Sequence, residues 1–433
     1  MPFKDLGLHP LLVKATRDLD FAEPTPVQAG AIPPILAGRD LLATAQTGTG
    51  KTAAFLLPIL HRLIEQPRGQ TRAVIVSPTR ELAEQIDAGC RKLGKHTQLR
   101  STLIVGGKPM MPQERALRAG PDVVVATPGR LLDHMNHGAR FDKVLTLVLD
   151  EADTMLDMGF LPDVKRIITK LPGLQQTLMF SATMPPVIAK LASDILKNPA
   201  SVQIGRRTAT AVGITQAAYP VPTHLKTALL RHLLRNTEMP SVLVFVRTKH
   251  NAKRIAKQVA ADGFSVAELH SNRTPAQRTK AMEGFRRGAY QVMVATNVAA
   301  RGLDVDHITH VISVDVPDVP EEYVHRIGRT GRAGAEGDAF IFVAREEEQG
   351  LHRIERQIGQ RLPRVTLPEF NYTAPAPKPT GDGGGQRKQH GHGRQGGHRQ
   401  EGHRQDGHRQ GGNRQGHGSP GKGGPRPKSR HAT

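Results

Sequence analysis

The stretch that decides the fold is Leu41-Leu42-Ala43-Thr44-Ala45-Gln46-Thr47-Gly48-Thr49-Gly50-Lys51-Thr52. It joins a short apolar run to a glycine-rich turn and then to a segment with helical spacing, which is typical of a phosphate-binding loop. Gly48 and Gly50 let backbone N–H groups close around an anion, and the helix N-terminus adds a favourable dipole. Lys51 can then reach the β- and γ-phosphates of a nucleotide, and the Thr52 hydroxyl can bind Mg²⁺. We therefore predict a nucleotide-phosphate site made of Ala45, Gln46, Thr47, Gly48, Thr49, Gly50, Lys51 and Thr52.

Apolar runs of four to five residues recur on either side of this loop and predict buried parallel strands. The first set covers 41–45, 73–77, 102–105, 123–126, 145–149 and 177–180, and the second covers 242–246, 266–269, 292–295, 311–314 and 339–343. Segments with helical spacing, such as 80–93 and 251–261, lie between them. The alternation predicts two α/β domains, 1–205 and 213–370, joined by a polar linker at 206–212. Each should hold a parallel sheet with helices on both faces, and ligands should bind at the carboxyl ends of the strands.

An acidic segment, Asp150-Glu151-Ala152-Asp153, directly follows the predicted strand 145–149. An acid at a strand end is the Walker B arrangement, in which Asp150 would hold Mg²⁺ through water, because Mg²⁺ keeps much of its hydration. Neighbouring side chains at a strand end point in different directions, so Glu151 can turn toward an attacking water. We predict Asp150 as a metal ligand and Glu151 as the base or water-orienting group.

An arginine-rich segment, residues 323–332, lies in the second domain. If it is helical, His325, Arg329 and Arg332 fall at i, i+4 and i+7 and share one face. Two guanidinium groups on one surface suit a γ-phosphate reached from across a domain boundary, as arginine fingers do. We therefore predict that Arg329 and Arg332 take part in phosphate chemistry.

Each of these motifs has a plain structural alternative. The general phosphate-loop pattern begins with Gly where this chain has Ala45, so a solvated Gly/Thr loop is one alternative. The acidic segment could be a solvated turn, and the arginine segment could be a basic surface that faces nucleic acid. The occurrence of all three motifs in one chain favours the nucleotide site.

Composition points to a polyanionic partner. The chain has 433 residues, with 60 Lys and Arg against 39 Asp and Glu, and its net charge of +21 is typical of nucleic-acid binding. The single cysteine, Cys90, excludes an intramolecular disulfide and a cysteine-based zinc site, and we expect it to be buried. No uninterrupted apolar run approaches a membrane span, and the first residues do not have the pattern of a signal peptide. We expect a cytoplasmic protein with no membrane association.

The motifs, in their order along the chain, resemble the DEAD-box RNA helicases of superfamily 2 over about residues 1–350. The name-giving Asp150-Glu151-Ala152-Asp153 is present, and 21–28 resembles the family's adenine-reading motif. The resemblance implies two tandem RecA-like domains with ATP and Mg²⁺ between them. It also implies a nucleotide site in which Gln28 hydrogen-bonds adenine and Phe3 is the upstream aromatic residue; the further members are Phe21, Gly302, Asp304, Arg329 and Arg332. The lead-in Phe3–Gly7 is most similar to the bacterial RhlE-type branch.

The same resemblance assigns residues to RNA and to coupling. Those implied to contact the RNA backbone are Arg80, Gly107, Thr127, Pro128, Gly129, Arg130, Arg247, Arg278 and Thr296. Those implied to couple the state of ATP to strand separation are Asp153, Ser181, Thr183 and His325. Four positions depart from the family pattern: Asp20, Ser271, Pro275 and Asn297. The last three lie in RNA-gripping or coupling segments, so we expect them to affect unwinding more than ATP hydrolysis.

The predicted function is an RNA-dependent ATPase that locally unwinds short RNA duplexes and remodels RNA or RNA–protein complexes. Neither domain holds a complete site, so hydrolysis should need closure of the two domains, which RNA would favour. The alternatives are an ATP-gated RNA clamp or annealing chaperone, and a DNA-directed ATPase of the same superfamily. Contacts to phosphates carry no sequence information, so RNA binding should be sequence-independent. We expect a monomeric core, with ribosomal or RNA-decay complexes as candidate partners.

The C-terminal segment 371–433 has a different composition from the rest. From residue 374 onward its only apolar side chains are three alanines, and twelve Lys and Arg against three acids give it a net charge of +9. A unit of the form Gly-His-Arg-Gln recurs every five residues from Gly397, a period that fits neither helix nor strand. We predict a disordered basic tail that attaches RNA through phosphate contacts, with a solvated linker as the alternative.

Overall fold

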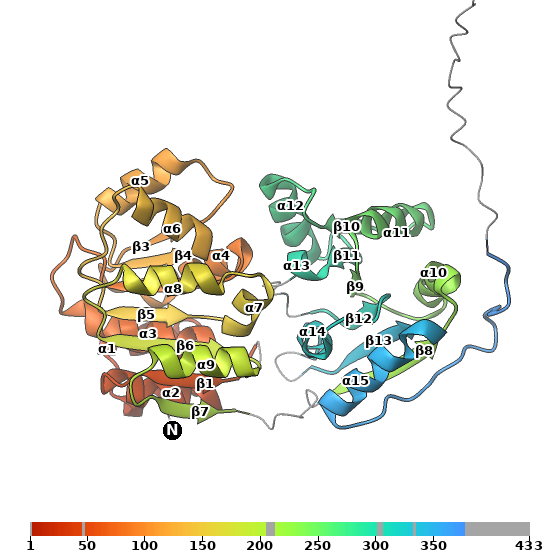
Figure 1. The fold of residues 1–433 in the computed structure, drawn as a ribbon, viewed down its shortest axis with the longest axis horizontal. Helices are drawn as coiled ribbons and strands as arrows, with labels where there is room; N and C mark the ends of the chain where they lie inside the picture. Colours follow the sequence, from red (N-terminus) through yellow and green to blue (C-terminus); the bar gives the residue numbers. More distant parts are fainter. Residues whose placement is uncertain are drawn as a thin grey trace, which may run out of the picture. The chain divides into compact units, whose positions relative to one another are not determined.

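The structure is a computed structural model that describes residues 2–45, 48–204, 213–300, 305, 307–331 and 335–376, and only the backbone at positions 275, 298 and 300. The chain up to Ala376 forms one compact unit that contains two parallel sheets (Figure 1). We call residues 2–204 lobe 1 and residues 213–376 lobe 2. The predicted linker 206–212 lies outside the described residues. Within the described ranges, every helix is too short or too polar to span a lipid bilayer.

The sheet of lobe 1 has seven strands in the order β3-β4-β2-β5-β6-β1-β7, and every pair in it is parallel. The central strands are buried on both faces, because their residues are almost all Val, Ile, Leu or Ala. Six of the seven lie where the sequence predicts them. The seventh, β7, alternates half-buried and exposed residues at the sheet edge, so it has no apolar run. The bounds are β1 (Leu41–Thr44), β2 (Ala73–Val76), β3 (Ser101–Ile104), β4 (Val123–Ala126), β5 (Thr146–Leu149), β6 (Gln176–Ser181) and β7 (Ala200–Gln203).

Helices cover both faces of this sheet, because alternate residues of each strand point to opposite sides. Ala73 and Ile75 pack with α1 to α4, whereas Val74 and Val76 pack with α5 to α9. Cys90 on α4 is buried in the first of these cores, as predicted. The helices are α1 (Pro10–Arg17), α2 (Pro26–Leu36), α3 (Lys51–Ile64), α4 (Arg80–Leu93), α5 (Met110–Arg118), α6 (Pro128–Asn136), α7 (Ala152–Asp157), α8 (Leu161–Thr169) and α9 (Pro186–Ile195), after a short 3₁₀ turn, η1 (Phe3–Leu6).

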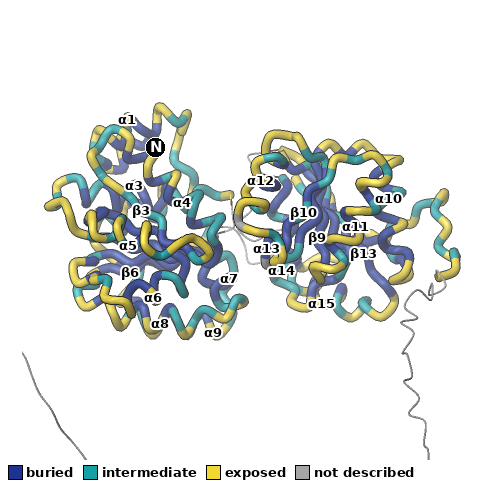
Figure 2. The backbone as a smooth tube through the Cα atoms, turned by 90° about the horizontal axis from the view of Figure 1, so that it is seen from above, coloured by how far each residue is buried: buried dark blue, intermediate teal, exposed yellow. Residues whose placement is uncertain are grey.

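The sheet of lobe 2 has six parallel strands in the order β10-β11-β9-β12-β13-β8. Figure 2 shows the central strands of both sheets dark blue, which marks them as the buried centre of each lobe. The predicted architecture of parallel sheets with helices on both faces is therefore confirmed. The strands are β8 (Ile214–Pro220), β9 (Val242–Val246), β10 (Val266–Leu269), β11 (Val292–Thr296), β12 (His310–Ser313) and β13 (Gly337–Val343).

The helices of lobe 2 divide in the same way. Those packed on one face are α10 (Lys226–Asn236) and α11 (Lys249–Ala261), and those on the other are α12 (Pro275–Arg286), α13 (Asn297–Ala300), α14 (Pro320–Ile327) and α15 (Glu348–Ile358). Two 3₁₀ turns, η2 (Thr223–Leu225) and η3 (Arg345–Glu347), complete the lobe.

The expected helical row of His325, Arg329 and Arg332 is wrong. Helix α14 ends at Ile327, and Gly328 follows it as the capping residue. Gly331 has φ +63°, in the left-handed region, so the backbone turns away where a helix would continue. Only His325 of the three is helical, and Arg332 lies outside the described residues.

The chain after α15 crosses lobe 2 as an extended segment. Ala218 donates its N–H to the Pro363 carbonyl at 2.8 Å and accepts the N–H of Val365 at 2.9 Å, so the segment pairs with edge strand β8. Val365, Leu367, Phe370, Tyr372 and Ala374 pack on the core beneath α10 and α11. The packed chain therefore continues past the tail boundary predicted at residue 370.

Candidate active site

The phosphate-loop segment has the backbone that the sequence predicts. Gly48 and Gly50 have φ +84° and +90°, and Gly50 is the N-cap of α3. The side chain of Lys51, the first helical residue, is only 6% exposed, and its Nζ has no hydrogen-bond partner among the described residues. Burying an ammonium group without a partner costs free energy, so this position calls for an anion. Gln46 and Thr47, which are also predicted in the loop, lie outside the described residues.

Two side chains from the start of α2 brace this loop. Thr25 Oγ1 donates to the Thr49 carbonyl at 2.8 Å, and Gln28 Nε2 donates to the Gly50 carbonyl at 3.1 Å. Gln28 Oε1 also accepts the N–H of Thr25 at 2.9 Å, which is half of a capping box. A Cβ at position 50 would collide with both side chains, so the loop needs glycine there. The sequence analysis missed Thr25, although a Thr three residues before Gln is the signal of such a box.

The acidic segment lies at the end of β5 and is buried. Asp150 is 3% exposed, and burial raises the pKa of its carboxyl to about 7, against the opposing charge of Lys51. Glu151 is 5% exposed and has φ +53°, a left-handed conformation that costs energy for a residue with a side chain. Its N–H donates to Asp150 Oδ1 at 3.1 Å. Backbone strain of this kind is concentrated at functional sites, where the surrounding fold maintains it.

Asp153 links the acidic segment to the end of β6. Its Oδ2 accepts the N–H of Ala182 at 3.1 Å, the N–H of Thr183 at 2.8 Å and the Thr183 hydroxyl at 3.0 Å. His325 Nε2, from α14 of lobe 2, lies 3.5 Å from the same oxygen. Burial alone would raise the pKa of Asp153, but the hydrogen bond and charge of His325 outweigh it, and the pKa lies below its ordinary value. Ser181 donates to the Thr183 carbonyl at 2.6 Å, so all four predicted coupling residues belong to one cluster.

The two predicted aromatic residues of the nucleotide site lie together but differ in exposure. The ring centroids of Phe3 and Phe21 are 6.3 Å apart. Phe3 is 4% exposed and belongs to the core, whereas Phe21 is 38% exposed and can be reached by a ligand. Of the predicted lobe 2 contributors, Arg329 is buried just after α14, and Gly302 and Asp304 lie outside the described residues.

The described residues fit a magnesium site in which the phosphates of the substrate supply some of the ligands. They contain no group of three or more His, Cys, Asp or Glu that could hold a metal by themselves. Mg²⁺, however, is usually bound by one or two carboxylates together with substrate phosphates and water. The buried carboxylate of Asp150 and the hydroxyl of Thr52, the second residue of α3, match that pattern.

The predicted RNA contacts of lobe 1 gather on the loops that follow β2, β3 and β4. The Arg80 guanidinium lies against the backbone of Gly106 and Gly107, where a Cβ at position 107 would collide with it. Arg130 donates to the Lys108 carbonyl at 2.8 Å, so it meets the same loop from α6. Thr127 is the N-cap of α6, and Pro128 and Gly129 are its first two residues.

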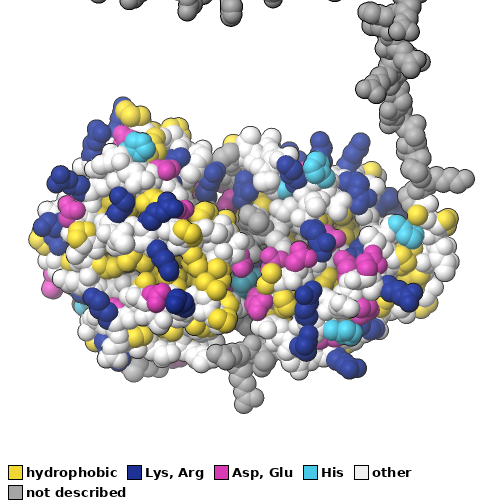
Figure 3. All heavy atoms as spheres, viewed as in Figure 1, with side chains coloured by type: hydrophobic (Ala, Val, Ile, Leu, Met, Phe, Trp, Pro, Cys, Tyr) yellow, Lys and Arg dark blue, Asp and Glu magenta, His cyan; other side chains and the backbone are white. Residues whose placement is uncertain are grey.

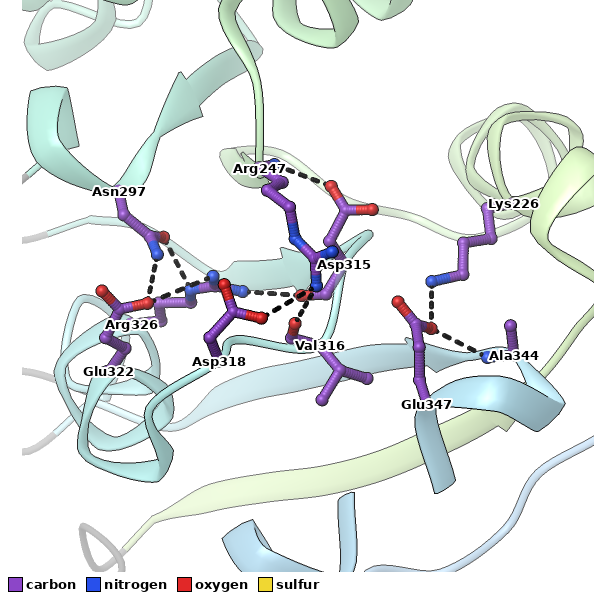
Figure 4. A network of polar contacts seen from close by, with 10 residues as sticks. All are labelled: Lys226, Arg247, Asn297, Asp315, Val316, Asp318, Glu322, Arg326, Ala344 and Glu347. Carbon is purple, nitrogen blue, oxygen red and sulfur yellow. Dashed lines mark hydrogen bonds and ion pairs between the residues drawn. The ribbon is translucent and has the colours of Figure 1, made fainter. Parts of the chain in front are cut away.

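In lobe 2, a network of polar contacts surrounds a buried arginine (Figure 4). Arg326 is 3% exposed, donates to Asn297 Oδ1 and the Asp315 carbonyl at 2.8 Å each, and lies 3.9 Å from Glu322. Burial lowers its pKa to about 10, and its guanidinium sits 5.3 Å from the Phe245 ring centroid. Asn297 Nδ2 also donates to Glu322.

Two of the predicted RNA contacts of lobe 2, Arg247 and Arg278, form polar contacts within the protein. Arg247 donates to the Val316 carbonyl at 3.0 Å, and its backbone N–H donates to Asp315 at 2.7 Å. Arg278 forms an ion pair at 2.7 Å with Glu81 of lobe 1. Thr296, the last residue of β11, is half-buried. Sequence reasoning assigned no partner to Arg326 or Glu81, because neither pairing is visible in one chain segment.

Comparison with known families agrees with both lobes. Residues 25–191 match the DEAD/DEAH box helicase family, and residues 225–334 match the helicase conserved C-terminal domain.

Two curated relatives are similar over most of the chain. The DEAD-box ATP-dependent RNA helicase CshA of Bacillus cereus is 41% identical over 370 residues, which cover 85% of this chain and 70% of that protein. The DEAD-box ATP-dependent RNA helicase RhpA of Helicobacter pylori is 40% identical over 371 residues, which cover 85% and 75%.

Solved structures are similar as well. Dbp5 of S. cerevisiae, bound to RNA and ADP BeF3, has a TM-score of 0.77 and 32% identity, covering 84% of this chain and 95% of that one. Mss116p bound to ssRNA and AMP-PNP has a TM-score of 0.77 and 29% identity, covering 84% and 79%.

Proposed function

The chain belongs to the DEAD-box family of ATP-dependent RNA helicases, and we propose how its own residues carry out RNA-dependent ATP hydrolysis. The observation that carries the proposal is the buried ammonium of Lys51 at the N-terminus of α3, which has no hydrogen-bond partner in the described part of the chain and lies beside a glycine loop with left-handed backbone. Lys51 and the backbone N–H groups of the loop bind the β- and γ-phosphates of ATP. Phe21 and Gln28 contact the adenine, as the family resemblance implies.

Asp150 and Thr52 would hold Mg²⁺ together with the phosphates of the nucleotide. Burial raises the pKa of Asp150 to about 7, whereas the positive charges of Lys51 and of a bound metal ion would favour its ionised form. When bound, Mg²⁺ neutralises the charge that develops on the phosphate oxygens. Glu151, fixed by its left-handed backbone, orients the attacking water and accepts its proton. Arg329 and Arg332 stabilise the γ-phosphate from lobe 2.

RNA stimulates hydrolysis because it contacts both lobes. Arg80, Gly107 and Arg130 bind its backbone from lobe 1, and Arg247, Arg278 and Thr296 bind it from lobe 2. The cluster of Asp153, Thr183 and His325 then couples the occupancy of the nucleotide site to the residues that bind RNA. A ligand that favours the joined lobes raises the affinity of the other ligand by the same factor. The predicted RhlE-type branch, cytoplasmic location, monomeric core and ribosomal or RNA-decay partners remain predictions.

The experiment is an ATPase assay of the full chain with and without RNA, beside strand separation on blunt and overhang duplexes. We expect RNA to stimulate hydrolysis severalfold or more, and short duplexes to separate only with ATP. An absence of stimulation would overturn the proposal. Tight RNA binding with a nonhydrolysable ATP analogue but no strand separation would favour the clamp instead. If DNA stimulates ATP hydrolysis and displaces RNA from the protein, the DNA-directed alternative is favoured.

The role proposed for the basic tail has a separate test. Deleting residues 377–433 removes most of a segment whose net charge is +9, so RNA affinity should fall and become less dependent on salt. ATP hydrolysis without RNA should not change. An unaltered salt dependence would show that the tail is a linker.

A further inference from the structure

A basic pocket lies on lobe 2, away from the residues assigned to ATP. Its cavity of about 460 Å³ is lined by α11, by Glu268 of β10 and by the chain that follows β10. Figure 3 shows Lys, Arg and His side chains close together over the region where Figure 1 draws α11 and α12. The charged side chains that line the pocket, besides two histidines, are Lys249, Lys253, Arg254, Lys257, Glu268 and Arg273.

The positive charge of this pocket is mostly uncompensated. Helix α11 contains no acidic residue between Lys249 and Ala261. Asp262, directly after it, pairs with Arg231 and Arg235 of α10. Glu268, the only acid in the lining, is engaged by Arg273 and His270 at 3.0 Å each.

The lysines of α11 stand in a row that works against the stability of the helix. Lys249, Lys253 and Lys257 are spaced i, i+4 and i+8, and like charges at this spacing repel each other. Lys253 and Lys257 are exposed and form no hydrogen bond or ion pair within the part of the chain that the structure describes. A row with this spacing is stabilised when an anion lies along it.

The geometry favours a chain of phosphates over a single small anion. Eight residues of α-helix, from Lys249 to Lys257, extend about 12 Å. A free phosphate needs donors that converge on one point, whereas cations spread along 12 Å match successive charges of a polyanion. We propose that this pocket is an additional RNA site that holds the phosphate backbone of an RNA segment beyond the one bound by the helicase motifs. The inference rests on the proposed function, because RNA is the polyanion on which this chain acts.

The position of the pocket supports an RNA occupant. None of the assigned lobe 2 RNA contacts lines it. Arg254 donates to Thr227 of α10 at 3.2 Å, and His224, at the start of the same region, hydrogen-bonds the Ala374 carbonyl at 2.9 Å. Arg254 of the pocket and Ala374 both therefore contact the chain around the start of α10.

The test is the salt dependence of RNA binding by the double variant Lys253→Gln/Lys257→Gln in the full chain. Fluorescence anisotropy with a labelled single-stranded RNA of about 20 nucleotides is measured between 50 and 200 mM KCl. Two lost contacts should reduce the slope of log affinity against log salt by about 1.4. The loss of affinity across that range should therefore be about sevenfold smaller than for the unaltered protein. Because both lysines are exposed, a melting curve is sufficient to show that the variant folds.

Two controls separate charge from position. Lys170→Gln/Lys190→Gln removes the same charge from exposed sites on lobe 1 and should leave the slope close to that of the unaltered protein. Lys253→Arg/Lys257→Arg keeps the charge in the pocket and should preserve the slope. Equal slopes for the pocket and lobe 1 glutamine variants would overturn the inference. A pocket that binds inorganic phosphate without any change in the RNA slope would show a small-anion site and would also overturn it.

Failure of the proposed function is distinguishable from failure of this inference. If the unaltered protein shows no RNA-stimulated ATPase, the proposed function is refuted. If the salt dependence of RNA binding nevertheless falls in the α11 variant and not in the lobe 1 control, the additional RNA site is supported. If RNA stimulates the ATPase but the α11 variant has the same salt slope as the lobe 1 control, the proposed function is supported and the additional RNA site is refuted.

Discussion

Lobe 1 and lobe 2 have the same parallel-sheet plan, but the strand ends of the two carry opposite kinds of polar site. In lobe 1, Lys51 is buried without a hydrogen-bond partner among the described residues, and Glu151 has a strained backbone. In lobe 2, Arg326 is buried just as deeply but is bonded to Asn297 and to the Asp315 carbonyl, with Glu322 nearby. Among the described residues, the first site leaves its cation without a hydrogen bond, whereas the second bonds its cation within the protein.

The difference between the two sites matches two different tasks, binding a ligand reversibly in lobe 1 and holding arginines in position in lobe 2. A site that must bind and release a nucleotide leaves its polar groups unsatisfied in the free protein, because full internal pairing would compete with the ligand. A site that must present arginines at a fixed position benefits from a scaffold that is already paired. Four predictions test this contrast.

The largest effect should come from Arg326→Met. The change removes the centre of a buried network and leaves Glu322 and the Asp315 carbonyl without their cation. Breaking a buried ion pair in this way costs about 3–5 kcal/mol of stability. Urea unfolding of the full chain should show the loss. A loss below about 1 kcal/mol would mean that the network does not organise lobe 2.

Lys51→Ala should show the opposite pattern. Loss of a single charge-stabilising donor typically reduces kcat about 10²–10³-fold, or about 3–4 kcal/mol in the barrier. The free energy of unfolding should fall far less than for Arg326→Met, because the ammonium has no hydrogen-bond partner among the described residues. Steady-state ATPase with saturating RNA measures the first quantity, and urea unfolding measures the second. Lys170→Ala is the matched control, and a marked loss of stability in Lys51→Ala would remove the contrast between the lobes.

Asn297→Asp should have an intermediate effect that depends on Glu322. The Asn297 amide donates to Glu322 while its oxygen accepts from Arg326, and an aspartate would bring two carboxylates together. We expect a loss of about 1–2 kcal/mol, reduced when Glu322→Gln is also present, in a double-mutant cycle measured by urea unfolding. Additive effects would show that Asn297 and Glu322 act independently.

The smallest effect concerns the attachment of the segment after α15. Leu362 and Arg364 of this segment donate hydrogen bonds to Glu355 of the helix. Burial opposes ionisation of Glu355, but these bonds lower its pKa from 4.5 to about 2. A lowered pKa stabilises the folded state above pH 4.5, and this contribution is lost as pH falls toward 2. Glu355→Gln should therefore cost about 1 kcal/mol at pH 7 and less as the pH approaches 2, measured by thermal unfolding. A difference that does not depend on pH would contradict this account.

The sequence by itself determined the strands and the nucleotide-binding motif. Central strands of a parallel sheet are buried on both faces, so their apolar runs mark them without reference to the rest of the chain. The loop before Lys51 and the acids after β5 are also local, because each needs only a strand end, a turn and the residue types of its chemistry. Edge strand β7 escaped prediction because its residues alternate half-buried and exposed, so it has no apolar run. Edge strand β8 escaped because its buried centre consists of Gln216, two alanines and Tyr219 rather than a run of large apolar residues.

Only the tertiary structure decided the contacts between distant segments. The bracing of Gly50 by Thr25 and Gln28, the pairing of Asn297 with Arg326 and the packing of residues 363–374 on lobe 2 join segments that are not adjacent in sequence. The arginine segment was misjudged because residue spacing predicts a shared face only while the helix lasts, and α14 ends before Arg329. The pocket on α11 likewise depends on which acids are already paired, and long-range packing decides that pairing.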